Sequence, residues 1–349
     1  MTVYTAIYAI FASLGIAVRR KQEALFLALA LLFLLFFMGT RYEVGCDFGG
    51  YLNRFENIHP YASLGEAFGK QEIAFSFLEI ATRTSGLGFV SLIFSSTLII
   101  LICYWVFLRQ IHNSLLVLAL LFPIMMMQLG MSGLRQGIAV GFLLVAATTF
   151  MKRQRLMTAL WIIIGTQFHL SAAVFLPLAF LAGRDVSLKQ MIAAGLLLSP
   201  LALLLVGDRI GVYQDRYVDE IYGDQSSAGA VFRYALNIVP AALFLYFRKT
   251  VEGHFPKEYQ LLLIFAIATV ALAPLTVLST FALHRLNFYV MPFTIMMAVY
   301  LIYCIPSTRD RSLALLIPIG AYGGYSVLWQ LTSLHFEYCY SNYQSYLAL

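Results

Sequence analysis

The feature that most constrains this chain is a succession of apolar runs, each about as long as a membrane is thick. Such runs recur from residue 2 to residue 331, and the short segments between them carry most of the charge. A helix needs about 20 apolar residues to cross the hydrocarbon core of a bilayer. With 61% hydrophobic and 11% charged residues, the chain has too much apolar surface for a water-soluble fold. We therefore predict an all-α, polytopic membrane protein.

The apolar runs divide into about twelve predicted spans, connected by short loops. They cover residues 2–18, 23–40, 88–108, 113–129, 137–151, 156–168, 171–182, 190–206, 231–247, 258–280, 286–305 and 312–331. A further short helix at 72–84 is followed by Gly86 and Gly88, which favours a re-entrant or interfacial segment. We expect residues 1–349 to form one integral membrane domain.

Basic residues indicate the orientation of these spans. Lys and Arg gather in the loops 19–21, 109–112, 152–155, 184–189, 248–257 and 306–311, which we therefore place in the cytoplasm. Both termini, the long loops 41–71 and 207–230 and the tail 332–349 then lie outside. Because the net charge of +6 is scattered over many loops, it does not predict nucleic-acid binding.

The four cysteines show neither metal-ligand spacing nor a CxxC pair. Cys103 and Cys304 fall inside apolar runs, where packing residues are expected. Cys46 and Cys339 both fall on the predicted outer face. The sequence leaves a bridge between them open, and we favour two separate thiols.

The predicted outer loop after residue 40 carries the first candidate catalytic group. Asp47 lies in a stretch with three glycines, so this loop is either a hydrated turn or a constrained segment that presents a carboxylate at the membrane surface. A carboxylate there could act as a general base on a hydroxyl. Glu72 begins the short helix, where an acidic side chain either interacts favourably with the positive end of the helix dipole or takes part in chemistry. Glu79 and Arg83, four positions apart, are expected to pair.

Arg135 and His169 lie at the ends of predicted spans. An arginine beside the membrane either reaches the lipid headgroups or binds phosphate with its planar fork of donors. An intramembrane histidine either packs two helix ends or serves a site. Arginines near helix ends recur on the predicted outer face, which points to a polyanion such as a lipid pyrophosphate; they are Arg41, Arg135, Arg233 and Arg285.

Tyrosines and acids alternate in loop 207–230, and further tyrosines fill the tail 332–349. We interpret them first as an aromatic belt at the membrane surface, with contact to a sugar as the alternative. No Walker A, HExxH, GxSxG or dinucleotide-binding motif occurs in a suitable context. The sequence therefore predicts neither ATP-driven transport nor a metal site, and no cofactor is expected.

At the candidate positions the sequence resembles the EpsG/Wzy-type family of bacterial polysaccharide polymerases. The matching pieces are an R-x-x-x-G-x-D-x-x-x-Y pattern with a following acid, L-R-Q-x-I-A, F-H-x-S-A and a late R-L-N-x-Y segment. Their residues here are Arg41, Gly45, Asp47, Tyr51 and Glu72; Leu134, Arg135, Gln136, Ile138 and Ala139; Phe168, His169, Ser171 and Ala172; and Arg285, Leu286, Asn287 and Tyr289.

The resemblance implies a GT-C-like, lipid-dependent glycosyltransferase in the bacterial inner membrane, with its site on the outer side. Its substrates would be undecaprenyl-pyrophosphate-linked oligosaccharides, used without metal or nucleotide sugar. The implied partners are membrane lipid, a flippase and a chain-length regulator.

The hypothesis gives each candidate residue a role. Asp47 is the first choice of base and Glu72 the second, while Arg135 and Arg285 stabilise the leaving pyrophosphate. His169 is a catalytic candidate that could donate a proton or a hydrogen bond. The expected substrate-binding residues are Arg41, Tyr51, Gln136, Arg233 and Tyr289. The alternatives are a flippase of lipid-linked oligosaccharide, a ligase of finished glycan and a non-catalytic scaffold.

Overall fold

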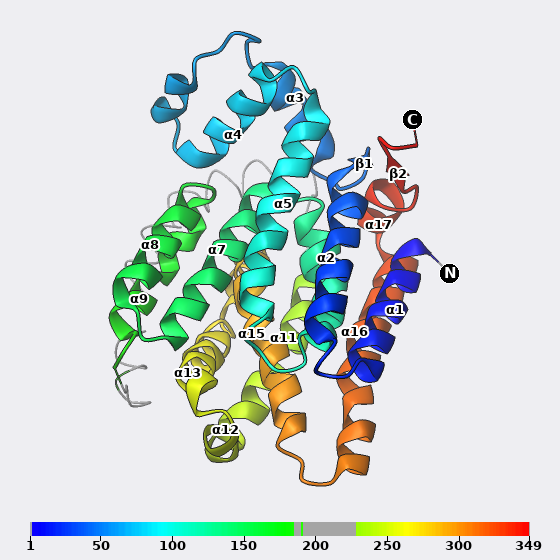
Figure 1. The fold of residues 1–349 in the computed structure, drawn as a ribbon, viewed down its shortest axis with the longest axis vertical. Helices are drawn as coiled ribbons and strands as arrows, with labels where there is room; N and C mark the ends of the chain where they lie inside the picture. The colour runs from blue at the N-terminus through cyan, green and yellow to red at the C-terminus, as the bar shows by residue number, and fades with distance from the viewer. Residues whose placement is uncertain (1, 185–189, 191–227, 349) are drawn as a thin grey trace. The chain divides into compact units, whose positions relative to one another are not determined.

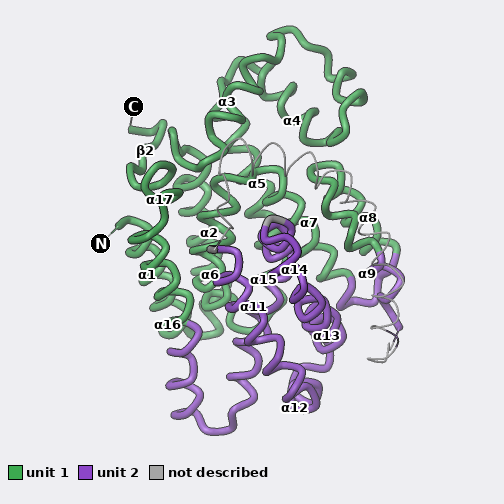
Figure 2. Tube along the Cα trace, turned by 180° about the vertical axis from the view of Figure 1, so that it is seen from behind, with its two compact units in different colours: residues 1–149, 156–176, 319–349 green, residues 150–155, 177–318 purple. Residues whose placement is uncertain are grey.

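The computed structural model describes residues 2–184, 190 and 228–348. Most of the predicted span 190–206 and of the loop 207–230 lies outside the described residues. The chain divides into two compact units, coloured separately in Figure 2. Unit 1 comprises residues 1–149, 156–176 and 319–349, and unit 2 comprises residues 150–155 and 177–318.

Unit 1 consists of helices and one very short pair of strands (Figure 1). Its α-helices are α1 (Val3–Ala17), α2 (Glu23–Gly39), α3 (Phe48–Glu56), α4 (Ile73–Thr84), α5 (Phe89–Leu108), α6 (Ser114–Leu121), α7 (Leu134–Met151), α8 (Arg155–Thr166), the later part of α16 (Thr308–Thr332) and α17 (Leu334–Cys339). Helix α6 continues as a π-helix over Phe122–Gly130, and 3-10 helices cover Leu64–Gly69 and Leu170–Phe175.

Unit 2 is also helical. It contains α9 (Pro177–Leu181), α11 (Ala228–Tyr246), α12 (Arg248–His254), α13 (Pro256–Ala271), α14 (Leu275–Leu278), α15 (Thr280–Tyr303) and the first part of α16. Asn237 on α11 donates to Asn287 on α15 at 3.1 Å and accepts from Thr294 at 2.8 Å, and all three side chains are buried. A neutral polar ladder therefore joins the two long helices.

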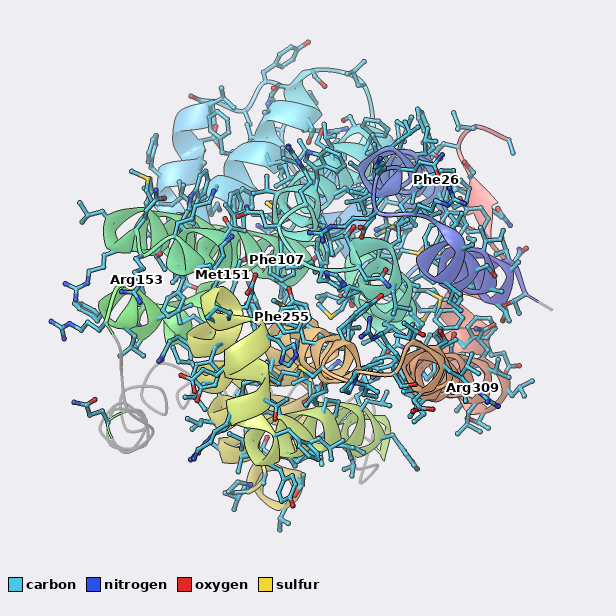
Figure 3. The ribbon with its side chains drawn as sticks, turned by 60° about the horizontal axis from the view of Figure 1, so that its bottom comes forward. Phe26, Phe107, Met151, Arg153, Phe255 and Arg309 are labelled. Atoms are coloured by element: carbon cyan, nitrogen blue, oxygen red, sulfur yellow. A yellow bond between two sulfur atoms is a disulfide. The ribbon has the colours of Figure 1, made fainter. Side chains whose placement is uncertain are left out.

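Five helices among the described residues are long and apolar enough to cross a membrane: 89–108, 134–151, 229–246, 282–303 and 308–332. Five shorter apolar helices accompany them. The prediction of an all-α membrane protein is thus confirmed, while the count of twelve spans stays a prediction. Figure 3 shows Arg153 and Arg309, from two of the predicted cytoplasmic loops, at the periphery of unit 2.

Two predicted spans differ in detail from the observed helices. The run 171–182 lies within one apolar helical segment, Leu170–Leu181, in which a 3-10 helix to Phe175 is followed by α9 from Pro177. The run 258–280 is interrupted after Ala271, where Pro274 precedes the separate short helix α14. Apolar composition did not reveal these breaks, because the residues on either side of them are equally apolar.

Helix α7 packs very closely against α5. A Cβ atom added at Gly137 would lie 3.0 Å from Ile100 Cδ1, and one added at Gly141 would lie 3.0 Å from Cys103 Cβ. Small residues four positions apart allow two helix backbones to approach within a membrane. Because this contact fixes α7, it also fixes Arg135 at the start of that helix.

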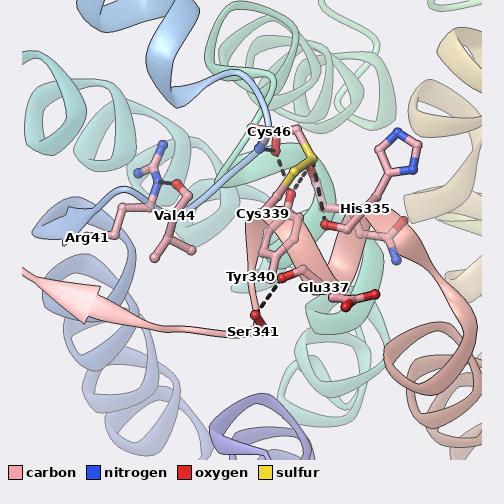
Figure 4. The surroundings of a disulfide bond; sticks show 10 residues. Arg41, Val44, Cys46, His335, Glu337, Cys339, Tyr340 and Ser341 are labelled. Atoms are coloured by element: carbon pink, nitrogen blue, oxygen red, sulfur yellow. Dashed lines mark hydrogen bonds between the residues drawn. A yellow bond between two sulfur atoms is a disulfide. The ribbon is translucent and has the colours of Figure 1, made fainter. Parts of the chain in front are cut away.

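The C-terminal segment is tied back to the loop that follows α2. Strand β1 (Arg41–Tyr42) pairs antiparallel with β2 (Gln344–Ser345), and Cys46 forms a disulfide with Cys339 (Figure 4). Our expectation of two separate thiols was wrong, since residues 293 positions apart in sequence meet at a Cα–Cα distance of 4.9 Å. We call the paired segments 40–47 and 339–346 the terminal clamp.

Candidate functional site

The candidate site begins with the unusual first turn of α4. The amides of Ala74 and Phe75 donate to the backbone carbonyl of Gln167, at 3.1 and 3.4 Å. Helix-initial amides usually need a side-chain cap. Because a carbonyl from another segment fills that need, the Glu72 carboxylate makes no capping bond and is available for other partners.

Glu72 joins Arg135 and His169 in one cluster. Arg135 Nη1 lies 2.7 Å from Glu72 Oε2, and His169 Nδ1 lies 2.8 Å from Glu72 Oε1. Three segments that are distant in sequence thus meet at one carboxylate. The Glu72 side chain is 11% exposed and that of His169 17%, whereas Arg135 remains 33% exposed.

The surroundings of Glu72 stabilise its charged form. Burial alone would raise the pKa of this carboxyl, but the hydrogen bond with His169 and the positive charge of Arg135 together lower the pKa to about 2. A carboxylate with so low a proton affinity is a poor general base at neutral pH. The geometry instead suits an anion that orients Arg135 and His169.

Helix α3 contacts this cluster through Tyr51. The Tyr51 hydroxyl accepts a hydrogen bond from the Arg135 amide at 3.4 Å, and its ring lies 5.8 Å from that of Phe75 on α4. Arg135 Nε is buried and has no hydrogen-bond partner among the described residues. The guanidinium is therefore held by Glu72 and Tyr51, and the exposed third of the Arg135 side chain is the part that a ligand can reach.

His169 is held in place by the packing of its neighbour. The Phe168 ring stacks on Phe142 of α7 with centroids 5.4 Å apart, and the His169 amide donates to the Gly165 carbonyl at 3.0 Å. His169 itself has extended backbone angles at the start of the 3-10 helix. The turn after α8 is thereby fixed on the same helix that carries Arg135.

A second ion pair lies two turns further along α4. Arg54 Nη2 of α3 lies 2.7 Å from Glu79 Oε2, and burial raises the pKa of the Glu79 carboxyl even though Arg54 opposes that shift. The expected Glu79–Arg83 pair was wrong. Arg83 Nε instead donates to the Ile58 carbonyl at 3.1 Å, and its guanidinium lies over the Phe55 ring.

Asp47 lies four positions before Tyr51, and Gln136 directly follows Arg135. Asp47 is exposed and precedes α3, where its carboxylate makes no capping hydrogen bond. It is one helical turn from Tyr51, whose amide donates to the Asp47 carbonyl at 3.0 Å. Gln136 follows Arg135 on α7 and is buried.

Arg41 lies in the terminal clamp rather than beside Glu72. It is 1% exposed, and its guanidinium donates to the backbone carbonyls of Val44 at 3.0 Å and Met38 at 2.6 Å. These bonds close the loop after α2. The tail tyrosines also pack here, since Tyr340 is buried and Tyr343 donates to the Phe37 carbonyl at 2.7 Å.

The remaining candidates belong to unit 2. Arg233 on α11 is buried, and its Nη2 lies 2.6 Å from Nδ1 of His284 on α15. Arg285 follows His284, and Tyr289 is fully buried one turn later. Within unit 2 the two predicted arginine positions are therefore adjacent along one helix–helix contact.

Sequence reasoning missed the pairing of Arg54 with Glu79. The available signal was that Arg54 lies three positions after Tyr51, so that both residues share one face of a helix.

No group of three or more His, Cys, Asp or Glu side chains suited to a metal occurs among the described residues.

The fold and the cluster define an integral membrane protein with long apolar helices and a partly exposed cation–carboxylate–imidazole cluster at the start of one of them, α7. Residues 24–345 match the EpsG family, so the chain belongs to that family, which associates it with polysaccharide biosynthesis. No curated protein and no solved structure matches the chain.

Proposed function

We propose that this protein is a polysaccharide polymerase that joins undecaprenyl-pyrophosphate-linked oligosaccharide repeat units on the outer face of the inner membrane. The observation that carries the proposal is the Glu72–Arg135–His169 cluster, in which a half-buried arginine is held beside a carboxylate with its Nε–H unsatisfied. Membership in the EpsG family supports the same class of reaction.

The reaction transfers a glycan from one lipid carrier to an acceptor. The hydroxyl oxygen of the acceptor sugar bonds to the anomeric carbon of the donor glycan, and the bond from that carbon to the pyrophosphate oxygen breaks. The leaving undecaprenyl pyrophosphate keeps the electron pair, and the hydroxyl proton passes to a base. Catalysis therefore requires stabilised negative charge on the leaving group and a proton acceptor.

Arg135 supplies the positive charge in this mechanism. Guanidinium binds phosphate oxygens through a planar set of donors, and a preorganised donor contributes most where charge develops in the transition state. Glu72 and Tyr51 orient Arg135, and Glu72 also orients His169. Arg285 and Arg233 remain further candidates for the pyrophosphate. Gln136 follows Arg135 in sequence, and Tyr289 lies four positions after Arg285.

Asp47 remains our first choice of base. Its carboxylate is exposed at the start of α3 and is not used in capping that helix, whereas Glu72 is held as an anion by two partners. We therefore assign Glu72 to positioning rather than to proton transfer.

The test uses purified protein in nanodiscs with lipid-linked repeat units, without nucleotide sugar or added metal. The expected product is a ladder of multimers, accompanied by free undecaprenyl pyrophosphate. Movement of the same lipid between vesicle leaflets without a ladder would support a flippase instead. Transfer only to a different acceptor would support a ligase.

A further inference from the structure

Helix α4 holds two arginines with two glutamates in the same manner. Glu72 binds Arg135 of α7 and Glu79 binds Arg54 of α3, each with a 2.7 Å contact. The two glutamates are seven positions apart, which corresponds to a rise of about 10 Å along a helix. The repeated arrangement places two cations along one helix from two different elements.

Burial within the two pairs is strongly asymmetric. The carboxylates are 11% and 2% exposed, whereas the paired arginines, Arg135 and Arg54, are 33% and 39% exposed. In an ordinary surface ion pair both partners would be hydrated. Here the two carboxylates are buried, whereas the arginine side chains reach solvent. A ligand anion that approaches from solvent therefore meets guanidinium donors before it meets a carboxylate.

Both arginines have donor capacity left over. Arg54 uses only Nη2 among the described residues, toward Glu79 Oε2 and toward Ser76 Oγ at 3.5 Å. Arg135 binds Glu72 through Nη1, and its side chain is 33% exposed. Since a guanidinium carries five N–H donors, each side chain can bind its glutamate and an additional anion at the same time.

One aromatic ring of α4 packs against both Arg54 and Tyr51 of α3. The Arg54 guanidinium lies 5.7 Å from the centre of the Phe75 ring. The Tyr51 ring lies 5.8 Å from the same Phe75 ring, and the Tyr51 hydroxyl contacts the Arg135 amide. Phe75 is fully buried. Tyr51 and Arg54 therefore extend from one face of α3 toward the two ends of a single rigid surface on α4.

We propose that Arg54 is a second phosphate-binding residue, and that Arg54 and Arg135 together bind the pyrophosphate of the lipid carrier, each held by its own glutamate of α4. The inference rests on the proposed function for the identity of the ligand. Two linked phosphates carry more charge and more acceptor oxygens than a single phosphate, so they can engage two guanidinium groups at the same time.

The experiment measures binding of undecaprenyl pyrophosphate and of undecaprenyl monophosphate to the full-length protein in nanodiscs. R54A is expected to weaken pyrophosphate binding by about 10-fold or more, because a charge-assisted hydrogen bond is lost. Monophosphate binding should change much less. R54K retains the charge without the planar fork, and its affinity should lie between those of R54A and the wild type.

The matched control is R83A. Arg83 also comes from the α3–α4 region, but it donates to the Ile58 carbonyl and lies over Phe55 instead of pairing with a carboxylate. R83A should lower the melting temperature and leave pyrophosphate affinity unchanged. E79Q replaces the carboxylate that holds Arg54 with a neutral amide, so it should weaken pyrophosphate binding, but by less than R54A, because the guanidinium is still present.

The outcomes separate the inference from the proposed function. If the wild type polymerises and R54A binds pyrophosphate as tightly as the wild type, Arg54 only joins α3 to α4 and the inference is wrong. Equal losses of affinity in R54A and R83A would overturn it as well. If the wild type binds pyrophosphate through Arg54 but forms no ladder, the binding site stands and the polymerase assignment fails.

Discussion

Two regions of unit 1 each contain an arginine that the sequence marked as a phosphate ligand, and their surroundings differ sharply. In the terminal clamp, Arg41 is 1% exposed and donates to the backbone carbonyls of Val44 and Met38. In the Glu72–Arg135–His169 cluster, here called the α4 cluster, Arg135 binds the Glu72 carboxylate and stays 33% exposed. The residue type is the same, and the partners differ.

The partners determine what each arginine can do. Arg41 is shut off from solvent and bonded to two backbone carbonyls, so it closes a loop. A single carboxylate anchors Arg135 from behind and leaves part of its guanidinium accessible. The comparison teaches that an arginine at a membrane surface becomes a binding candidate when a buried anion holds it and solvent still reaches it.

The two regions are joined through the turn before α7. The Cys46 amide donates to Ser132 Oγ at 2.9 Å, and that oxygen lies 2.5 Å from the Tyr340 hydroxyl. Gly45, with a φ of 104°, passes so close to the Met131 carbonyl that a Cβ atom would lie 2.1 Å from its oxygen. The clamp therefore supports the segment from which Arg135 begins α7.

The largest effect should follow from replacing Arg135. R135A removes the cation that faces the leaving pyrophosphate, so polymer formation should fall by at least about 100-fold, the usual loss for a preorganised transition-state donor. The melting temperature should change little, because His169 still pairs with Glu72. The measurement is ladder formation at equal amounts of folded protein. Wild-type chain length would refute the assignment of Arg135.

Replacing Arg41 should lower stability and leave activity nearly unchanged, the reverse of R135A. R41A leaves the Met38 and Val44 carbonyls buried without donors and creates a void, so the folded state should lose about 3 kcal/mol. Thermal unfolding in detergent measures that loss. Activity per folded molecule should remain near that of the wild type. A stable R41A protein that makes no polymer would instead return Arg41 to substrate binding and end the contrast with Arg135.

Hydropathy was sufficient to predict several of the long helices. The predicted runs 23–40 and 88–108 became α2 (Glu23–Gly39) and α5 (Phe89–Leu108), because uninterrupted apolar stretches leave the backbone no alternative to helix in lipid. The prediction of a single membrane domain stays a prediction. The grouping of the described residues into two units depends on contacts that composition does not encode.

The partners of individual side chains were harder to predict. Glu79 and Arg83 have the spacing of a helix ion pair, but Glu79 binds Arg54 because α3 packs on that face of α4. Glu72 was expected at a helix start and lies there, yet its role depends on Gln167, whose carbonyl accepts from the α4 amides. Such choices are made by tertiary contacts between segments far apart in sequence.

Removing the disulfide should destabilise the terminal clamp less than R41A does. The double variant C46S/C339S should lower stability by about 2 kcal/mol, because the covalent tie between the loop and the tail is lost. Strand pairing and the hydrogen bonds of Arg41 should still hold the clamp, so polymerisation should continue. Melting with and without reductant measures the change, and reductant should have no effect on the double variant. Complete loss of polymer would mean that the clamp sets the position of Arg135.

The smallest expected effect is the acid sensitivity of the α4 cluster. The pKa of Glu72 is lowered from 4.5 to about 2, so its contribution to stability is fully present above pH 4.5 and is lost as the pH falls toward 2. The wild type should therefore lose melting temperature more steeply than E72Q over that window. Partial solvent exposure of Arg135 screens the pair and limits the difference. R41A should retain the wild-type slope, because Arg41 has no carboxylate partner in the described structure. If E72Q and the wild type showed parallel pH profiles, Glu72 would not be held as an anion, and its earlier role as a base would regain support.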